Sequence, residues 1–509
     1  MSLLKKLAGE TALYGLSSIL GRLLTFVFLT PFLTNVFNDD RAQIGIQTDI
    51  YAWAAFLMII FTYRMETAFF RFGSKKEDRA TAYKTATTSV VASTSVLVLL
   101  LIAFAQPIAN QLGYPQHANY VIWFAFILGF DTLAAVPFAL LRLEGKALKF
   151  ALVRLANLFT QLGFVLLFLY VLPNYYPQYY NPEMGIGYVF IANLIASGVT
   201  FLLLLPTYWA KVGMDKEVMD APERPIFDRE LLKNMLLYSM PLVLAGFAGI
   251  INEVLDRILL KALLEGSSKE VLEQLGIYGA CYKIAIFMNL FTQAFNYAAE
   301  PFFFRNADKK YAKDLYANIA FLFALVGTVG FLSIMLFMDI VQYFVASNYR
   351  EGLIIVPILL MANLCLGLYY NLAIWFKLSN QTRYGAIIAV VGASITIIGN
   401  IVFIPMMLRL GYPGYLGSAW ATLLCYASMV VLAYYLGQKH YPIPYQAGRI
   451  VFYLGLVAGF YGAYTWGIKP YLTTQSLLSY VVSASIVLLY LVVIYAIDGR
   501  RIKTMLRQN

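Results

Sequence analysis

Long runs of apolar residues, separated by short polar stretches, make up the sequence from end to end. Many of these runs reach about 20 residues or more, the length that an α-helix needs to cross about 30 Å of hydrocarbon. The pattern predicts an all-α polytopic membrane protein without a soluble domain. It predicts fourteen transmembrane helices, at residues 12–36, 44–70, 83–106, 118–141, 150–172, 185–209, 232–259, 276–304, 315–338, 352–376, 384–408, 414–437, 450–468 and 475–497.

Composition agrees with this interpretation and removes several other classes. Hydrophobic residues make up 61% of the chain and charged residues 13%, whereas soluble domains are about 45–50% apolar and about 25% charged. The three cysteines lie in apolar runs and there are two histidines, so neither a disulfide framework nor metal-ligand spacing is present. No glycine-rich phosphate loop and no catalytic constellation stands out. We therefore expect no cofactor, no bound metal and no enzymatic activity.

The net charge of +11 is distributed unevenly over the gaps between the spans. Of the 38 Lys and Arg residues, 28 fall in gaps on the side of the N-terminus or in the first five residues of the spans that follow these gaps, and six fall in gaps on the other side. Because cytoplasmic loops carry the excess of Lys and Arg, this bias predicts that both termini are cytoplasmic. It also explains the positive charge without a nucleic-acid partner. The first span lacks a small-residue cleavage site, so we expect an uncleaved anchor.

The chain shows signs of an internal duplication of six helices. Glu66–Arg71 ends the second predicted span and Glu300–Arg305 ends the eighth, at an offset of 234 residues. Six is an even number, so the two halves would enter the membrane in the same orientation, as in transporters with parallel repeats. The expected organisation is a six-helix bundle at 1–210, a cytoplasmic linker at 211–231, a second six-helix bundle at 232–440, and helices 13 and 14 with a cytoplasmic tail at 441–509. Further pairs with the same order are Lys149 and Arg383, Tyr51 and Tyr282, Phe56 and Phe287, and Gly187 and Gly417.

Charged residues within the predicted spans are candidates for function. A charge near the bilayer centre costs roughly 2.5–3.5 kcal/mol even on insertion scales, so it should face a cavity or a partner. Arg22 and Asp131 lie near the middle of their spans, Arg64 lies toward the cytoplasmic end of the second, and Lys283 lies within the eighth. A structural ion pair or snorkelling to the interface is the alternative for each of them.

Two further patterns occur in the seventh and eighth spans. The eighth span carries a stripe of five polar side chains that fall within about 60° of one another around a helix. Either this stripe lines a wet pathway, or its side chains bond to neighbouring helices. Glu253 and Arg257 in the seventh span are spaced i, i+4, which suits an ion-pair latch or a solvated helix end, with Asn252 and Asp256 beside them. The stripe consists of Tyr282, Asn289, Gln293, Asn296 and Glu300.

Several of these segments resemble a known family over nearly the whole chain. The likeness is to polysaccharide-exporting flippases, the Wzx-type (PST) members of the multidrug/oligosaccharidyl-lipid/polysaccharide (MOP) exporter superfamily. The segments that carry it are Tyr238-Ser239-Met240-Pro241-Leu242, Asp256-Arg257-Ile258-Leu259, Gly276-Ile277-Tyr278, Tyr282-Lys283-Ile284-Ala285, Gly367-Leu368-Tyr369-Tyr370, Asn380-Gln381-Thr382, Asn400, Pro405 and Gly417-Ser418-Ala419.

The resemblance implies a MATE-like fold of two six-helix bundles plus two extra C-terminal helices in the bacterial inner membrane. It implies alternating access for an oligosaccharide on an undecaprenyl diphosphate carrier, moved to the periplasmic leaflet for polysaccharide or lipopolysaccharide biosynthesis. Arg22, Arg64 and Lys283 are then candidates to contact the diphosphate, and the stripe of the eighth helix is a candidate to contact the sugars. Asp131, Glu253, Asp256 and Arg257 are candidates for gating or ion coupling.

Other functions remain open on the sequence. A lipid II flippase shares the architecture, but its characteristic second-helix sequence is not found here. A drug/cation antiporter of the superfamily usually has twelve helices, and it would use one of the acidic residues to bind Na⁺ or H⁺. A membrane glycosyltransferase or polymerase would need a large outer loop, and every outer gap is short. The coupling ion and any contact with glycosyltransferases or a polymerase are also open.

Overall fold

The computed structural model describes residues 21, 23–208, 227–307, 309, 311–379, 381–472 and 476–507. Within these ranges the chain is helical, with no strand. Thirteen of its helical segments are long and apolar enough to cross a membrane, and Phe26–Val36 is a shorter apolar helix. The predicted all-α membrane architecture is confirmed. The number fourteen is not, because residues 12–20 and 22 of the first predicted span lie outside the described residues.

In the described part of the chain, thirteen long helices and several short ones correspond to the predicted spans from the second onward. In the first half they are α2 (Thr30–Val36), α3 (Ala42–Thr62), α4 (Met65–Phe72), α5 (Lys76–Ala103), α6 (Ala105–Gln111), α7 (Ala118–Leu143), α8 (Ala147–Leu166), α9 (Leu172–Tyr175) and α10 (Gly187–Tyr208). Then follow α11 (Arg229–Leu263), α12 (Ser268–Arg305), α13 (Ala312–Leu336), α14 (Met338–Val341), α15 (Val356–Leu372), α16 (Ile374–Leu378), α17 (Arg383–Arg409), α18 (Gly414–His440), α19 (Ala447–Gly462) and α20 (Leu477–Arg507).

The chain divides into two compact units. Unit 1 comprises 1–29, 42–254 and 266–272, and unit 2 comprises 30–41, 255–265 and 273–509. The chain therefore passes between the units within the long helices α11 and α12, and also between residues 41 and 42. In unit 1, α10 packs against α7 and α8, and α5 packs against α7. In unit 2, α18 packs against α15 and α17, and α13 packs against α15. The same packing pattern thus recurs six spans later.

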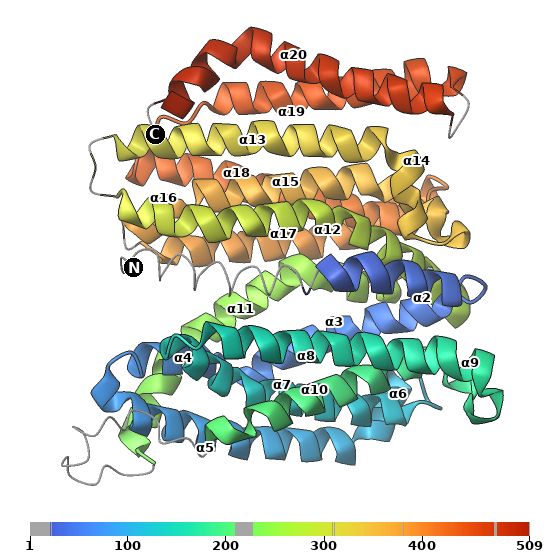
Figure 1. The fold of residues 1–509 in the computed structure, drawn as a ribbon, viewed down its shortest axis with the longest axis vertical. Helices are drawn as coiled ribbons and strands as arrows, with labels where there is room; N and C mark the ends of the chain where they lie inside the picture. Colours follow the sequence, from blue (N-terminus) through green and yellow to red (C-terminus); the bar gives the residue numbers. More distant parts are fainter. Residues whose placement is uncertain are drawn as a thin grey trace. The chain divides into compact units, whose positions relative to one another are not determined.

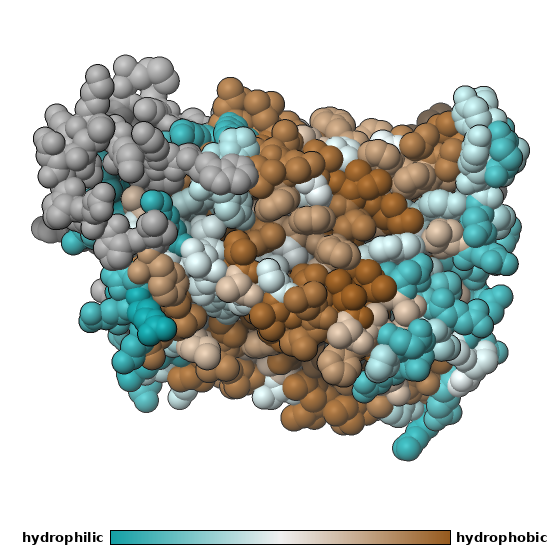
Figure 2. Space-filling model, turned by 90° about the horizontal axis from the view of Figure 1, so that it is seen from below, coloured by the Kyte–Doolittle hydropathy of each residue, from teal (hydrophilic) through white to brown (hydrophobic). Residues whose placement is uncertain are grey.

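The last two helices form an added layer on unit 2. Figure 1 shows α19 and α20 beside α13, and both of them contact it. The buried Asp498 of α20 joins the pair, because it accepts hydrogen bonds from Arg449 and from the Tyr453 hydroxyl of α19. Many leucines, valines and aromatic residues of the helices are exposed. On the face shown in Figure 2, such residues form a broad central area with hydrophilic residues at both ends, as expected for a protein surrounded by hydrocarbon.

Candidate functional site

A cluster of charged and aromatic side chains lies inside unit 2, where the end of α11 meets α12. The Asp256 carboxylate is buried and accepts a hydrogen bond from the Tyr278 hydroxyl of α12. Arg257 places Nη1 3.4 Å from the same carboxylate, and its guanidinium lies 4.4 Å from the ring centroid of Tyr282. Lys283 follows on α12, close enough to Arg257 for the two cations to repel. Four candidates, which form two adjacent pairs on the consecutive helices α11 and α12, therefore lie together.

The cluster brings two cations together. Arg257 lies beside the Asp256 carboxylate, and Lys283 lies near Arg257. Among the described residues, no hydrogen bond or ion pair holds the Lys283 ammonium. An uncompensated cation in an apolar setting is costly, so the arrangement favours an anion as a third component. Phosphate oxygens are suited to both the guanidinium and the ammonium.

The polar stripe of α12 continues along the helix from this cluster. Tyr282 is buried, whereas Asn289, Gln293 and Asn296 are half-buried. The Gln293 Nε2 donates to Asn289 Oδ1 at 2.7 Å, so two members of the stripe bond to each other. Glu300 is helical, but its side chain lies outside the described part. The partly exposed amides retain donors and acceptors that can bind a polar ligand.

Arg64 occupies a break in the helix in unit 1. Tyr63 and Arg64 have positive φ angles of 32° and 56°, which interrupts the segment between α3 and α4. Non-glycine residues in this region are strained and cluster at functional sites. The guanidinium packs against α11, where a Cβ added at Gly246 would lie 2.8 Å from Arg64 Nη2. The helix break therefore directs the Arg64 side chain toward the part of α11 that belongs to unit 1. Arg22 lies outside the described residues.

A second intramembrane carboxylate, Asp131 of α7, lies among neutral polar groups in unit 1. Its hydrogen-bond partner is Ser197 of α10, and Arg154 is the nearby positive charge. Tyr51 of α3 lies close to Asp131, and its hydroxyl accepts from Asn193 Nδ2 at 2.9 Å. Sequence reasoning singled out Asp131 but missed these partners. The helical spacing of Asn193, Ser197 and the next polar residue, Thr200, was the available signal.

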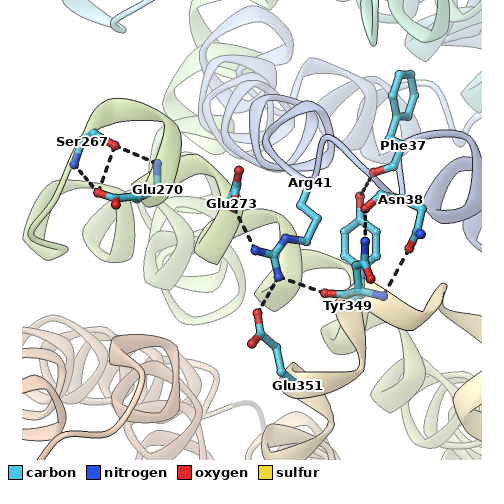
Figure 3. A network of polar contacts seen from close by, with 9 residues as sticks. Phe37, Asn38, Arg41, Ser267, Glu270, Glu273, Tyr349 and Glu351 are labelled. Carbon is cyan, nitrogen blue, oxygen red and sulfur yellow. Dashed lines mark hydrogen bonds and ion pairs between the residues drawn. The ribbon is translucent and has the colours of Figure 1, made fainter.

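A network of polar contacts inside unit 2 was also missed. We call it the outer latch, after the side to which the distribution of Lys and Arg assigns Arg41. Arg41 Nη2 donates to Glu273 Oε2 at 2.8 Å, and Nη1 donates to Glu351 Oε1 at 2.7 Å and to the Asn348 carbonyl at 3.0 Å (Figure 3). Burial opposes the charge of this guanidinium, but the bonds and charges of the two glutamates outweigh burial and raise the pKa of Arg41 above its ordinary value. The cation therefore stays charged.

Neutral hydrogen bonds extend the outer latch beneath Arg41. The Tyr349 hydroxyl donates to the Phe37 carbonyl at 2.8 Å, and Asn348 Nδ2 donates to the Asn38 carbonyl at 2.9 Å. The buried Cys281 thiol donates to the Tyr349 carbonyl at 3.2 Å. Residues 37–41 are thus fastened to residues 348–351. The sequence shows Arg41 only as one of the few cations on its side, with no hint of partners 232 and 310 residues away.

Glu253 lies exposed on α11, and Asn252, on the same helix, is buried. The contacts described for Arg257 are those with Asp256 and Tyr282. Among the residues that the structure describes, no three His, Cys, Asp or Glu side chains are grouped as they would be around a metal ion. The arrangement thus offers cations, amides and aromatic rings for a polar anionic ligand.

Comparison with known sequences establishes the family. The model of the family described as "Polysaccharide biosynthesis protein" matches residues 7–307, which is more than half of the chain. The chain belongs to this polysaccharide biosynthesis protein family. No curated protein matches the sequence. The predicted family resemblance is therefore confirmed, and membership assigns the protein to polysaccharide biosynthesis.

Solved structures show the fold that this family member shares. The inward closed conformation of the lipid II flippase MurJ matches with a TM-score of 0.63 at 13% identity, covering 91% of this chain and 99% of that one. An inward-facing multidrug resistance MATE transporter of the MOP superfamily matches with a TM-score of 0.56 at 14% identity, covering 86% and 99%. The MATE-like fold class is confirmed, and its known examples here are transporters.

Proposed function

We propose that this protein is a flippase for undecaprenyl-diphosphate-linked oligosaccharides. It moves them from the cytoplasmic to the periplasmic leaflet of the bacterial inner membrane, with both termini in the cytoplasm, and serves polysaccharide or lipopolysaccharide biosynthesis. The observation that carries the proposal is the family match, joined to a fold shared with a lipid flippase. A sugar head group cannot cross hydrocarbon alone because its hydroxyls would lose their water partners, so a protein must supply replacements.

The two parts of such a substrate suit different groups of the site. The diphosphate needs cations, and Arg257 and Lys283 lie close to each other in the cluster. Arg64, held at the helix break of unit 1, is a further candidate, as is Arg22. Neutral amides such as Asn289, Gln293 and Asn296 suit sugar hydroxyls, and the Tyr282 ring suits a sugar face. A negative-inside potential favours export of the anion by about 2.3 kcal/mol per charge per 100 mV.

Alternating access requires contacts that form in one state and break in another. The outer latch is such a contact, because its carboxylates, carbonyls and amides are reachable by water and readily change partners. We assign Arg41 to the closing of the outer side. Asp131, with its hydroxyl and amide neighbours, is the proposed site of H⁺ or Na⁺ coupling. A carboxylate within the membrane is energetically costly, and such groups commonly belong to ion or proton pathways.

The test is translocation in proteoliposomes that carry a fluorescent oligosaccharide on a polyprenyl diphosphate. Lys283→Gln removes the charge and keeps a polar side chain, and we expect a loss of transport of at least tenfold. Lys283→Arg, the matched control, keeps the charge and should retain most of the rate. Arg257→Gln should also impair transport, while both variants remain in the membrane at wild-type levels.

The same vesicles separate the rival functions. Cation-driven dye movement without lipid translocation would indicate an antiporter, and chemical change of the sugar would indicate a glycosyltransferase or polymerase. If the wild-type protein moves the labelled lipid but Lys283→Gln does so equally well, the flippase proposal survives and the diphosphate site does not. If the wild type moves no diphosphate-linked sugar, the function itself is refuted.

A further inference from the structure

A segment rich in tyrosine lies between α8 and α10 in unit 1. Residues 174–182, which we call the tyrosine loop, consist only of Tyr, Asn, Gln and Pro. The loop includes the end of α9 and the 3₁₀ turn Pro177–Tyr179, and it runs into a second 3₁₀ turn, Pro182–Met184. From residue 155 to residue 182 the chain has no Lys, Arg, Asp or Glu. None of the transport residues named above lies in the loop.

Three tyrosine side chains of this loop are largely exposed. The exposed fractions are 67% for Tyr175, 51% for Tyr176 and 73% for Tyr179. In the described part of the chain, these three side chains make no hydrogen bond and no contact with another ring. Gln178 and Asn181, their neighbours in sequence, are also exposed. The loop therefore presents aromatic faces, phenolic hydroxyls and amides together.

Contacts with neighbouring helices tie the tyrosine loop to the rest of unit 1. The rings of Tyr180 and Tyr188 stack, with centroids 5.5 Å apart and planes 15° from parallel. The Tyr188 hydroxyl accepts a hydrogen bond from the Asn181 N–H at 2.9 Å, and the Ile186 N–H donates to Gln43 Oε1 of α3 at 2.9 Å. The prolines of the loop also fix φ at their positions. A surface that is ordered in advance loses less conformational entropy when it binds a ligand.

The length of the preceding helix places the loop outside the hydrocarbon. The helical segment Ala147–Tyr175 has Lys149 in its first turn, and cations of this kind mark the inner ends of the spans. From Lys149 to Tyr175 the segment rises about 39 Å, whereas the hydrocarbon is about 30 Å thick. On the right of Figure 1, α9 and the turn after it extend beyond α6 and α10. The loop therefore stands on the outer side, among polar groups and water.

The composition of the tyrosine loop favours one class of ligand over two others. Anchors at a membrane surface combine aromatic residues with Lys and Arg, and protein interfaces have an apolar core enriched in Met and Arg. The tyrosine loop contains no charged residue and no Leu, Ile, Val, Met, Phe or Trp. A neutral sugar ring matches what it does contain. The C–H faces of the sugar pack on the aromatic rings, and the sugar hydroxyls bond to phenols and amides, which both donate and accept.

We propose that the tyrosine loop binds uncharged sugar rings of the exported saccharide on the outer side of the membrane. The inference rests on the proposed function, because a flippase for lipid-linked oligosaccharides delivers sugars to that side. The loop is a second sugar site, in addition to the amides of α12, and it makes no use of the diphosphate. It therefore contributes to the choice of glycan and not to the binding of the carrier.

The test compares two probes in proteoliposomes that contain the full-length protein. One probe is a polyprenyl diphosphate bearing a dye-labelled neutral oligosaccharide, and the other is the same carrier bearing the dye alone. The triple variant Tyr175→Ala/Tyr176→Ala/Tyr179→Ala should slow transport of the sugar-bearing probe at least threefold and leave the sugar-free probe unchanged. The corresponding triple Phe variant keeps the rings and should retain at least half of the rate. The matched control is Tyr471→Ala, which removes another exposed ring on the outer side, in unit 2, and should behave as wild type.

Saturation-transfer NMR in nanodiscs gives a second readout that does not depend on transport. Irradiation of the aromatic resonances should saturate the ring hydrogens of the free oligosaccharide, at least threefold less in the triple Ala variant and about equally in the triple Phe variant. Equal transfer in wild type and triple Ala variant would overturn the inference and leave the proposed function intact. Equal slowing of both probes by the triple Ala variant would also overturn it, since the loop would then act as a membrane anchor. If the wild type moves neither probe but binds the oligosaccharide through these rings, the proposed function fails and the sugar site stands.

Discussion

The outer latch can be tested by replacing Arg41 with glutamine, which keeps the polarity of the side chain and removes its charge. The bond to Glu273 joins side chains that are 27% and 23% exposed, while Glu351 is 57% exposed. Exposed pairs contribute about 0–1 kcal/mol, and hydrogen bonds to charged groups at partly buried sites contribute about 1.5–3 kcal/mol. We therefore assign about 1–2 kcal/mol to the Glu273 bond and less than about 1 kcal/mol to the Glu351 bond.

A loss of about 2 kcal/mol corresponds to a change of about 30-fold in the population of the open latch. Cys281 is a native reporter of this population, because its buried thiol donates to the Tyr349 carbonyl beneath the latch. After Cys365→Ala and Cys425→Ala, it is the sole thiol that a small maleimide can alkylate. When opening and closing are fast, the rate of alkylation follows the open population. We expect Arg41→Gln to accelerate it 10- to 30-fold.

Three comparisons make this experiment decisive. Glu273→Gln should accelerate alkylation more than Glu351→Gln, because the Glu273 carboxylate is the more buried of the two. The double variant Arg41→Gln/Glu273→Gln should change the rate by less than the product of the single changes, since the two residues interact directly. Raising the salt concentration should narrow the difference between wild type and variants by screening. An unchanged rate in Arg41→Gln, or a larger effect of Glu351 than of Glu273, would refute the reasoning.

Three other predictions concern separate parts of the molecule. Gly45→Ala should lower the Tm by several degrees, because a Cβ there would lie 1.9 Å from the Leu272 carbonyl oxygen and overpacking costs about 1–3 kcal/mol. The control is Gly163→Ala, where a Cβ meets nothing within 4 Å. Equal Tm values for the two variants would contradict the packing of Gly45 against Leu272. Asp498→Asn should release α19 from α20 and increase the cleavage of both helices by protease, because Arg449 and Tyr453 lose a charged acceptor. Tyr453→Phe should have a smaller effect. If Asp498→Asn were as resistant to protease as the wild type, apolar packing alone would hold the two helices together. Asp131→Asn should abolish any dependence of transport on a pH or Na⁺ gradient, while downhill exchange of the substrate stays intact. If the variant still depended on a gradient, Asp131 would have no role in ion coupling.

Much of the architecture could be predicted from the sequence, because the cost of placing polar groups in hydrocarbon acts on each helix separately. The positions of the spans, the alternation of apolar and polar stretches, and the uneven placement of Lys and Arg can therefore each be recognised from local segments of the sequence. The recurrence of motifs six helices apart has a counterpart in the packing, since α10 packs on α7 and α8 as α18 packs on α15 and α17. The intramembrane charges Asp131 and Lys283 could be named for the same reason, since a charge is conspicuous in an apolar run.

The partners of these charges could not be predicted. Asp131 and Ser197 lie on α7 and α10, Arg41 reaches Glu273 and Glu351, and Arg449 reaches Asp498. Long apolar helices in lipid are hydrophobic on nearly all sides, so the sequence does not mark which face meets a neighbour. That choice is made by side-chain packing between helices, through contacts such as that of Gly45 with the Leu272 carbonyl. The sequence alone determined that the chain consists of membrane-spanning helices and which of its charges lie within them. Helix packing decided which charges meet, because it depends on the shapes of surfaces that come together only after every helix has formed.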